Sequence, residues 1–254
     1  MMKKLQLTIW RALPILIFVF GWESATRYDH HLSFFFGQPS TIGKYFVSKM
    51  MNGTLEIDIA TTVVEVVVGF ILGNIGGLII GLTLWCSRTL FEISQPYVIA
   101  LGAAPVFALA PLLIIWFGTG MLAKICIVTM STIVIALSQS YTGAGEVDAD
   151  HIRLLKSFGA NKGQIFRKVV APSSIVWVIA AFRMNVSFAL LGAFIAEYIS
   201  SSNGLGHMIL VASGLFDISL VLCGVFCFVG IALCLNWVIS LLEDPIKHGV
   251  ARLL

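Results

Sequence analysis

Long apolar stretches separated by short polar segments run through most of the chain. Crossing the hydrocarbon core of a bilayer takes about 20 apolar residues per helix, so stretches of this length predict membrane-spanning helices. The predicted spans cover residues 7–25, 57–85, 97–117, 122–140, 174–197 and 218–242. The pattern therefore predicts an all-α membrane protein with six transmembrane helices, folded as one domain over residues 1–254.

Two of the connections carry further information. In the segment of about 38–52, the apolar Tyr45, Phe46 and Val47 lie among polar positions. This pattern predicts an amphipathic helix that lies on the outer membrane interface. Residues of about 143–172 form the longest connection, and we expect them to form a loop on the cytoplasmic side.

The distribution of Lys and Arg predicts the orientation, because cytoplasmic loops carry an excess of these residues. With the N-terminus placed in the cytoplasm, most of the basic residues also lie on that side. The outer side then holds Arg27, Lys44, Lys49 and Lys124. We therefore expect both termini in the cytoplasm, as an even number of spans requires.

Composition narrows the function classes. The chain is 58% hydrophobic and 11% charged, whereas an ordinary soluble domain carries about 25% charged residues. This composition excludes a disordered chain and argues strongly against a soluble enzyme. A net charge of +3 is too small to indicate nucleic-acid binding. The five cysteines show no metal-ligand spacing, and no phosphate-binding Gly-x-x-x-x-Gly-Lys-Ser/Thr loop is present. We therefore expect no metal site, no catalytic residue and no cofactor bound by this chain.

Four glycines recur at every fourth position of the second predicted span. Glycines at this spacing share one helix face and allow a neighbouring helix to approach closely. The sequence therefore predicts a helix-packing stripe formed by Gly69, Gly73, Gly77 and Gly81.

Ionisable residues within the predicted spans are candidates for function, because a charge in the bilayer is costly. Glu65 and Arg183 each lie about two turns inside a span, and Glu197 lies at the outer end of the fifth span. Glu65 and Arg183 could pair with each other, or Glu65 could contact a cationic or hydrogen-bond-donating solute. Alternatively, both could lie near the interfaces, with Arg183 extending its charge towards water.

Two prolines, Pro105 and Pro111, are predicted to break the third span. A broken helix is tolerated in a membrane where its freed backbone groups face protein or a water-filled cavity.

The long connection predicts two short helices joined at a glycine. Asp148 and Asp150 suit the first turn of one helix, and Gly159 suits its C-terminal end. Asn161 and Gln164 have the spacing of a capping box that starts a second helix, which Pro172 is expected to stop. The exposed apolar residues of this loop suit either contact with the membrane or docking of a soluble partner.

This loop resembles the "EAA" loop of ABC-importer permeases, in which a glycine is followed at a fixed distance by a proline. Gly159 and Pro172 have that separation. The run from Pro105 to Gly120 is similar to the third-span signature of the nitrate, taurine, aliphatic-sulfonate and bicarbonate branch. The segment from Glu197 to Gly206 is similar to its "AE…S.GLG" stretch, and Gln38-Pro39-Ser40 to its "LPSP" start.

The resemblance implies a type I importer permease of the bacterial inner membrane. Two permease copies, two ABC ATPase subunits that bind ATP and Mg, and an extracytoplasmic solute-binding protein would form the transporter. The solute would be a small polar molecule such as an oxyanion, a sulfonate or a vitamin precursor. The resemblance places the ATPase-coupling residues at Arg153, Leu154, Leu155, Phe158, Gly159, Ala160, Phe166 and Pro172. It places candidate residues of the translocation path at Phe107, Trp116 and Asn185, beside the ionisable Glu65, Arg183 and Glu197.

Two positions depart from the family pattern. Arg153 occupies the place of the family's acidic residue, and Glu65 occupies the place of a basic residue. An alternative function is therefore an ion-coupled secondary transporter that uses Glu65 and Arg183 and needs no partner chain. A second alternative is a membrane scaffold without transport activity.

Overall fold

The computed structural model describes the backbone of residues 2–200 and 202–251, and the side chains of these residues except 2–9, 12, 30, 242 and 244–251. Within this part, every regular element is a helix. Among the described residues, four helices are long and apolar enough to cross a membrane, and a bent helix pair is a fifth candidate span. The predicted all-α membrane fold is confirmed.

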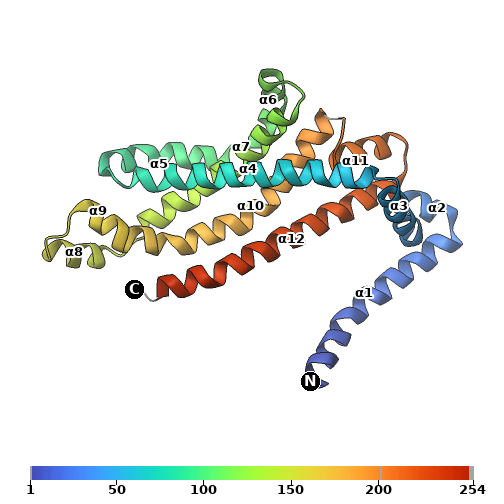
Figure 1. Ribbon diagram of the computed structural model, residues 1–254, viewed down its shortest axis with the longest axis horizontal. Helices are drawn as coiled ribbons and strands as arrows, with labels where there is room; N and C mark the ends of the chain where they lie inside the picture. Colours follow the sequence, from blue (N-terminus) through green and yellow to red (C-terminus); the bar gives the residue numbers. More distant parts are fainter. Residues whose placement is uncertain (1, 201, 252–254) are drawn as a thin grey trace.

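The helices are arranged as a long bundle (Figure 1). The four candidate spans are α4 (Thr54–Leu84), α7 (Met121–Gly145), α10 (Ala171–Ile199) with the turns that precede it, and α12 (Ile218–Ala251). The bent pair consists of α5 (Arg88–Ala103), then η1 (Val106–Leu109) with α6 (Ala110–Phe117). The remaining helices are α1 (Met2–Tyr28), α2 (His30–Phe36), α3 (Pro39–Met51), α8 (Ala149–Ser157), α9 (Lys162–Ile165) and α11 (Leu205–Gly214).

The core of the bundle is formed by α4, α7 and α10. Val66 of α4, Val128 of α7 and Val186 of α10 are buried together in one apolar cluster. The long helix α12 covers α10 and α11, whereas α1 packs on α2 and α3 and leaves the bundle (Figure 1). The predicted first span, 7–25, falls within α1, and the side chains of its first residues lie outside the described part.

The glycine stripe of α4 faces α7. All four glycines are buried, and a Cβ atom placed on Gly77 would lie 2.5 Å from the Ile133 carbonyl oxygen. A Cβ on Gly69 would lie 2.5 Å from Val128, and one on Gly81 would lie 2.7 Å from the Leu137 carbonyl oxygen. The two backbones are therefore in contact over about three turns, at a separation that no larger residue permits.

The third predicted span is bent by 79° between α5 and the segment Val106–Phe117. The bend follows Ala104 and begins at Pro105, which has no N–H group to continue the helix. Pro111 lies in the first turn of α6, where a proline is tolerated, so it does not cause the break. The span also starts earlier than predicted, because Ser87 caps α5 by accepting a hydrogen bond from the Leu90 N–H (3.4 Å).

Pro172 does not stop the second helix of the long connection, contrary to the prediction. The chain is helical without interruption from Lys162 to Ile199. Phe166–Val170 forms a π-helical turn, in which the Ala171 N–H donates to the Phe166 carbonyl oxygen. The wider turn accommodates the proline, since it removes the need for the regular hydrogen bond at this point.

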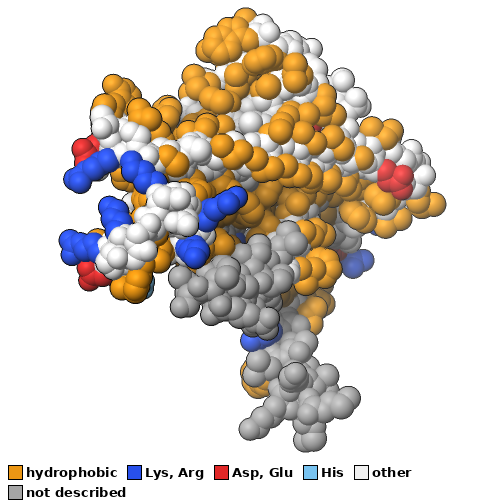
Figure 2. Space-filling model, turned by 60° about the vertical axis from the view of Figure 1, so that its left-hand side comes forward, with side chains coloured by type: hydrophobic (Ala, Val, Ile, Leu, Met, Phe, Trp, Pro, Cys, Tyr) orange, Lys and Arg blue, Asp and Glu red, His pale blue; other side chains and the backbone are white. Residues whose placement is uncertain are grey.

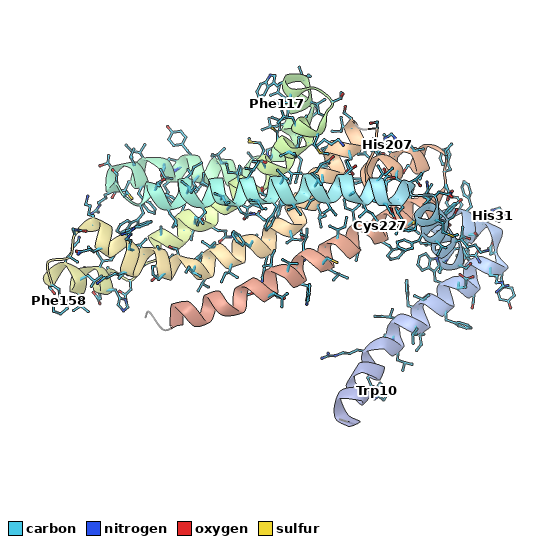
Figure 3. The ribbon with its side chains drawn as sticks, viewed as in Figure 1. Trp10, His31, Phe117, Phe158, His207 and Cys227 are labelled. Carbon is cyan, nitrogen blue, oxygen red and sulfur yellow. The ribbon has the colours of Figure 1, made fainter. Side chains whose placement is uncertain are left out.

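The two ends of the bundle differ in character. One end holds α8 and α9, and Figure 2 shows Lys and Arg side chains gathered there, whereas hydrophobic side chains cover the flanks. Phe158 lies at this end, and His207 of α11 lies at the opposite end (Figure 3). At the α11 end the Tyr45 hydroxyl of α3 donates to the Asp217 carboxylate (2.6 Å), and this bond raises the pKa of Tyr45.

Candidate functional site

A buried cluster of charged side chains lies where α4, α7 and α10 meet near α11. Glu65 of α4 accepts a hydrogen bond from the Lys124 ammonium of α7, with 2.6 Å between Oε1 and Nζ. The side chain of Glu65 is fully buried, and that of Lys124 is 8% exposed. This ion pair joins two helices that otherwise meet through glycine. Lys124, which the distribution of charges assigns to the outer side of the membrane, is therefore a buried partner and not an exposed charge.

Glu197 belongs to the same cluster. The Thr62 hydroxyl donates to Glu197 Oε1 (2.7 Å), and the Gly206 N–H donates to Oε2 (2.6 Å). Glu197 is fully buried, and its carboxyl links α10 both to α4 and to the first turn of α11.

The segment Asn203–Gly206 covers this cluster. The Leu205 N–H donates to the Thr62 hydroxyl (3.0 Å), and the Gly204 N–H donates to Asp58 Oδ1 (2.8 Å). Gly204 has a φ of +118°, and a Cβ at this position would collide with the Glu197 carboxyl. The segment therefore needs glycine for its backbone conformation and for its close contact with Glu197.

A second polar group links the same three helices farther along the bundle. The Asn185 amide donates to Asn74 Oδ1 (2.7 Å) and to the Thr132 carbonyl oxygen (3.0 Å). Asn185 is fully buried, so its side chain connects α10 to α4 and α7 and does not line an open surface of this chain.

Arg183 does not pair with Glu65. Its guanidinium donates to Glu243 of α12, with 3.0 Å between Nε and Oε2 and a second bond from the terminal nitrogen. The Glu243 side chain is 7% exposed, whereas that of Arg183 is 57% exposed. The two ionisable residues therefore serve separate helix pairs, and the pairing of Glu65 with Arg183 considered from the sequence is not formed.

Two candidate residues lie near the bend of the third span. The Phe107 ring stacks on Phe188 of α10, with 6.2 Å between the ring centroids and 6° between the planes. Trp116 of α6 is 65% exposed and is free to contact lipid or a second protein. These residues lie apart from the buried cluster, on the outside of the three-helix core.

The long connection forms the two helices predicted for it. Asp148 caps α8 by accepting from the Asp150 N–H (2.8 Å), and Gly159 ends it with a φ of +78°. Asn161 and Gln164 form a complete capping box at the start of α9, with bonds of 2.9 and 2.8 Å. These local predictions are confirmed.

The candidate coupling residues divide into an exposed and an inward-facing set. Leu154 is 54% exposed, and Phe158 is 78% exposed and lies at the tip of the bundle (Figure 3). Arg153 is exposed and pairs with Asp150 (3.2 Å). Leu155, Ala160 and Phe166 instead pack against the buried Ala144, Ile165 and Val170. Leu154 and Phe158 thus form an exposed apolar tip, and the inward-facing residues of the same loop pack against the bundle.

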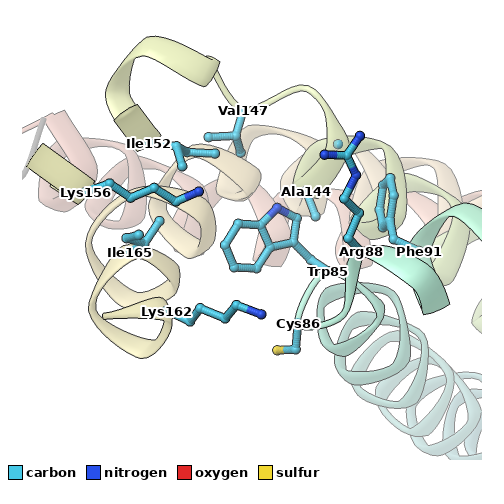
Figure 4. A pocket seen from close by; sticks show the side chains of 11 residues that line it. Trp85, Cys86, Arg88, Phe91, Ala144, Val147, Ile152, Lys156, Lys162 and Ile165 are labelled. Atoms are coloured by element: carbon cyan, nitrogen blue, oxygen red, sulfur yellow. The ribbon is translucent and has the colours of Figure 1, made fainter. Parts of the chain in front are cut away.

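A cavity of about 330 Å³ lies between this loop and the end of the bundle. The Trp85 indole lies at its centre, with Arg88, Lys156 and Lys162 around it (Figure 4). The indole also packs on Phe166, at 6.0 Å between ring centroids. The loop therefore packs on the turn between α4 and α5, so a displacement of the loop can displace this turn, and the reverse.

Within the described residues, no group of three or more His, Cys, Asp or Glu side chains lies close enough to hold a metal ion. Cys223 and Cys227 are buried on α12 as free thiols, and Cys234 is exposed.

Comparison with known proteins identifies the family. Residues 73–248 match the model of the binding-protein-dependent transport system inner membrane component. A probable ABC transporter permease protein of Haemophilus influenzae is 33% identical over 70% of this chain and 73% of its own length. The riboflavin transport system permease protein RibX of Chloroflexus aurantiacus is 30% identical over 95% of this chain and 91% of its own.

Solved structures show the same fold. A chain from the MetNI methionine ABC transporter in an inward facing conformation aligns with a TM-score of 0.67, over 78% of this chain and 98% of that chain, at 17% identity. Together with the matched family model, these similarities show that the chain belongs to the family of inner-membrane permease components of binding-protein-dependent ABC transporters.

Proposed function

We propose that this chain is the translocating subunit of an ATP-driven importer that uses two copies of the permease. It would span the membrane six times, with both termini in the cytoplasm. Two ATPase subunits would dock on the α8–α9 loop, and a solute-binding protein would deliver the solute to the opposite face. The observation that carries the proposal is the apolar tip of Leu154 and Phe158, held out from a basic end of the bundle.

The geometry of the loop suits the transmission of force. Its inward side packs on Ile165 and Val170, at the start of the continuous helix that leads through α10 to Glu197. A displacement of the tip would therefore move a rigid helix that ends at the buried cluster. ATP binding can drive such a change only if it stabilises one of two arrangements more than the other.

We propose a heterocyclic vitamin or vitamin precursor as the solute, because similarity to the riboflavin permease extends over nearly the whole length of both chains. The hypothesis that Glu65 contacts a cationic solute is not retained, since its charge is buried and neutralised by Lys124.

The coupling role can be tested by truncating the apolar tip. The Leu154→Ala/Phe158→Ala variant, assembled with its ATPase in vesicles, should lose solute uptake by about tenfold or more, because removing central apolar contacts of an interface typically costs 2 kcal/mol or more. Phe35→Ala is the matched control, since Phe35 is 67% exposed but lies in α2 at the opposite end. Equal uptake by the wild type and the tip variant would contradict the role.

A further inference from the structure

The buried cluster contains more negative than positive groups. Glu65 and Glu197 are fully buried and supply two carboxyls, whereas Lys124 supplies the one ammonium group among the described cluster residues. If both carboxyls were ionised, one negative charge would remain uncompensated within a membrane-spanning helix core. Such a charge is strongly unfavourable, so the arrangement calls for one further positive charge.

The second carboxyl oxygen of Glu65 indicates where the further positive charge would lie. Oε1 accepts from Lys124, whereas Oε2 is buried and has no hydrogen-bond partner among the described residues. Thr62, whose hydroxyl donates to Glu197 Oε1, lies three residues before Glu65 on α4, so both carboxyls lie against neighbouring turns of the same helix face. Two ionised carboxylates can only accept hydrogen bonds and repel each other, but a proton turns one of them into a donor. A single proton therefore satisfies both the orphaned oxygen and the charge balance.

The other ionisable groups nearby do not supply the charge. Asp58, on the same helix as Glu65, uses its carboxylate to accept from the Gly204 N–H. Lys49 of α3 and His207 of α11 line a separate cavity of about 290 Å³, together with Asp58. Of the described groups on α7 and α10, Lys124 and Glu197 belong to the cluster itself.

We propose that Glu65 and Glu197 hold one proton between them, which leaves the cluster with no net charge. The proton belongs to the pair and not to either residue alone. Because Asn203–Gly206 covers the cluster through its bonds to Thr62 and Glu197, the proton reaches water only when this segment moves. The proposal concerns the charge of the cluster and does not depend on the transport function proposed above.

Infrared spectroscopy of the purified chain in lipid nanodiscs at pH 7.5 tests whether Glu65 and Glu197 hold one proton between them. Exposed carboxylates have ordinary pKa values of about 4 and are ionised at this pH, so a protonated-carboxyl band reports buried acid groups. The wild type should show this band, at an intensity of one group per chain. Glu65→Gln and Glu197→Gln should both lose it, because the remaining carboxyl is ionised by Lys124. Lys124→Gln should double it.

Three results would overturn the proposal. A wild type without the band would show that both carboxyls are ionised, and stabilisation by sodium would then point to a bound metal cation instead. A band retained in either Gln variant would place the proton elsewhere. A wild-type band of two groups would mean that Lys124 is neutral. If the single variants fail to fold, Glu65→Lys/Lys124→Glu keeps the composition of the cluster, and it should retain a band of one group that a further Glu197→Gln removes.

Discussion

Glu65 and Lys124 show how a single residue can be misjudged from sequence. Each is a lone charge within an apolar stretch, and the pattern alone assigned Lys124 only to the outer side of the membrane and left Glu65 without a definite partner. In the structure they neutralise each other at 2.6 Å between two core helices. The usable signal was that Glu65 and Lys124 are isolated opposite charges near the start of two long apolar spans, with Glu65 one turn before the glycine stripe.

Replacing Lys124 by Met should destabilise the folded chain by about 3 kcal/mol. This value is at the lower end of the range for breaking a buried ion pair, because Glu65 can relieve the loss by taking up a proton. Denaturant unfolding in mixed detergent micelles measures the change. The matched control is Arg88→Gln, which removes an ion pair of side chains that are 92% and 62% exposed and should leave the unfolding midpoint unaltered. Equal behaviour of the two variants would show that the buried pair does not stabilise the fold.

Helices α4 and α7 pack against each other in one register over most of their lengths. The offset of 59 residues that relates Glu65 to Lys124 also relates Gly69 to Val128 and Gly77 to Ala136. A constant offset means that the two helices run parallel and in fixed register, with the ion pair continuing the glycine stripe by one further step. The four-residue period predicted the stripe, but it could not reveal which helix lies against it.

Gly77→Ala should therefore destabilise the chain by about 1–3 kcal/mol, because its Cβ would meet the Ile133 carbonyl oxygen and Ala136 at 2.5 and 2.6 Å. Gly76→Ala is the control on the same helix. Its Cβ would come no closer than 3.1 Å, to the flexible end of the Ile133 side chain, and alanine favours the helix, so it should be neutral or slightly stabilising. Unfolding in mixed micelles compares the two, and a smaller effect at Gly77 than at Gly76 would contradict the packing account.

Local capping signals were predictable from sequence, whereas the continuity of helices was not. The caps at Asp148 and Asn161 depend on side chains that bond to the next turn, so nearby residues determine them. The behaviour of Pro172 depends on a π-helical turn that the bundle supports, and the short helix α11 depends on its contacts with α10 and α12. Such features arise from packing between segments that are far apart in the chain.

At the scale of the whole molecule, the bundle joins two specialised ends. One end presents the apolar tip of Leu154 and Phe158 beside basic side chains, and the other holds the Asn203–Gly206 segment over a buried charged cluster. The continuous helix from Lys162 to Ile199 connects them. This arrangement suits a protein that transmits a signal from a soluble partner to the far side of a membrane.

The central claim is that this chain works as the membrane subunit of an ATP-driven importer, and purification from native membranes in a mild detergent tests it most directly. Mass spectrometry of the tagged chain should recover an ATP-binding-cassette subunit at one-to-one stoichiometry, and the Leu154→Ala/Phe158→Ala variant should lose that subunit while Phe35→Ala retains it. Recovery of the intact wild-type chain without an ATPase, under conditions that preserve other membrane complexes, would contradict the account.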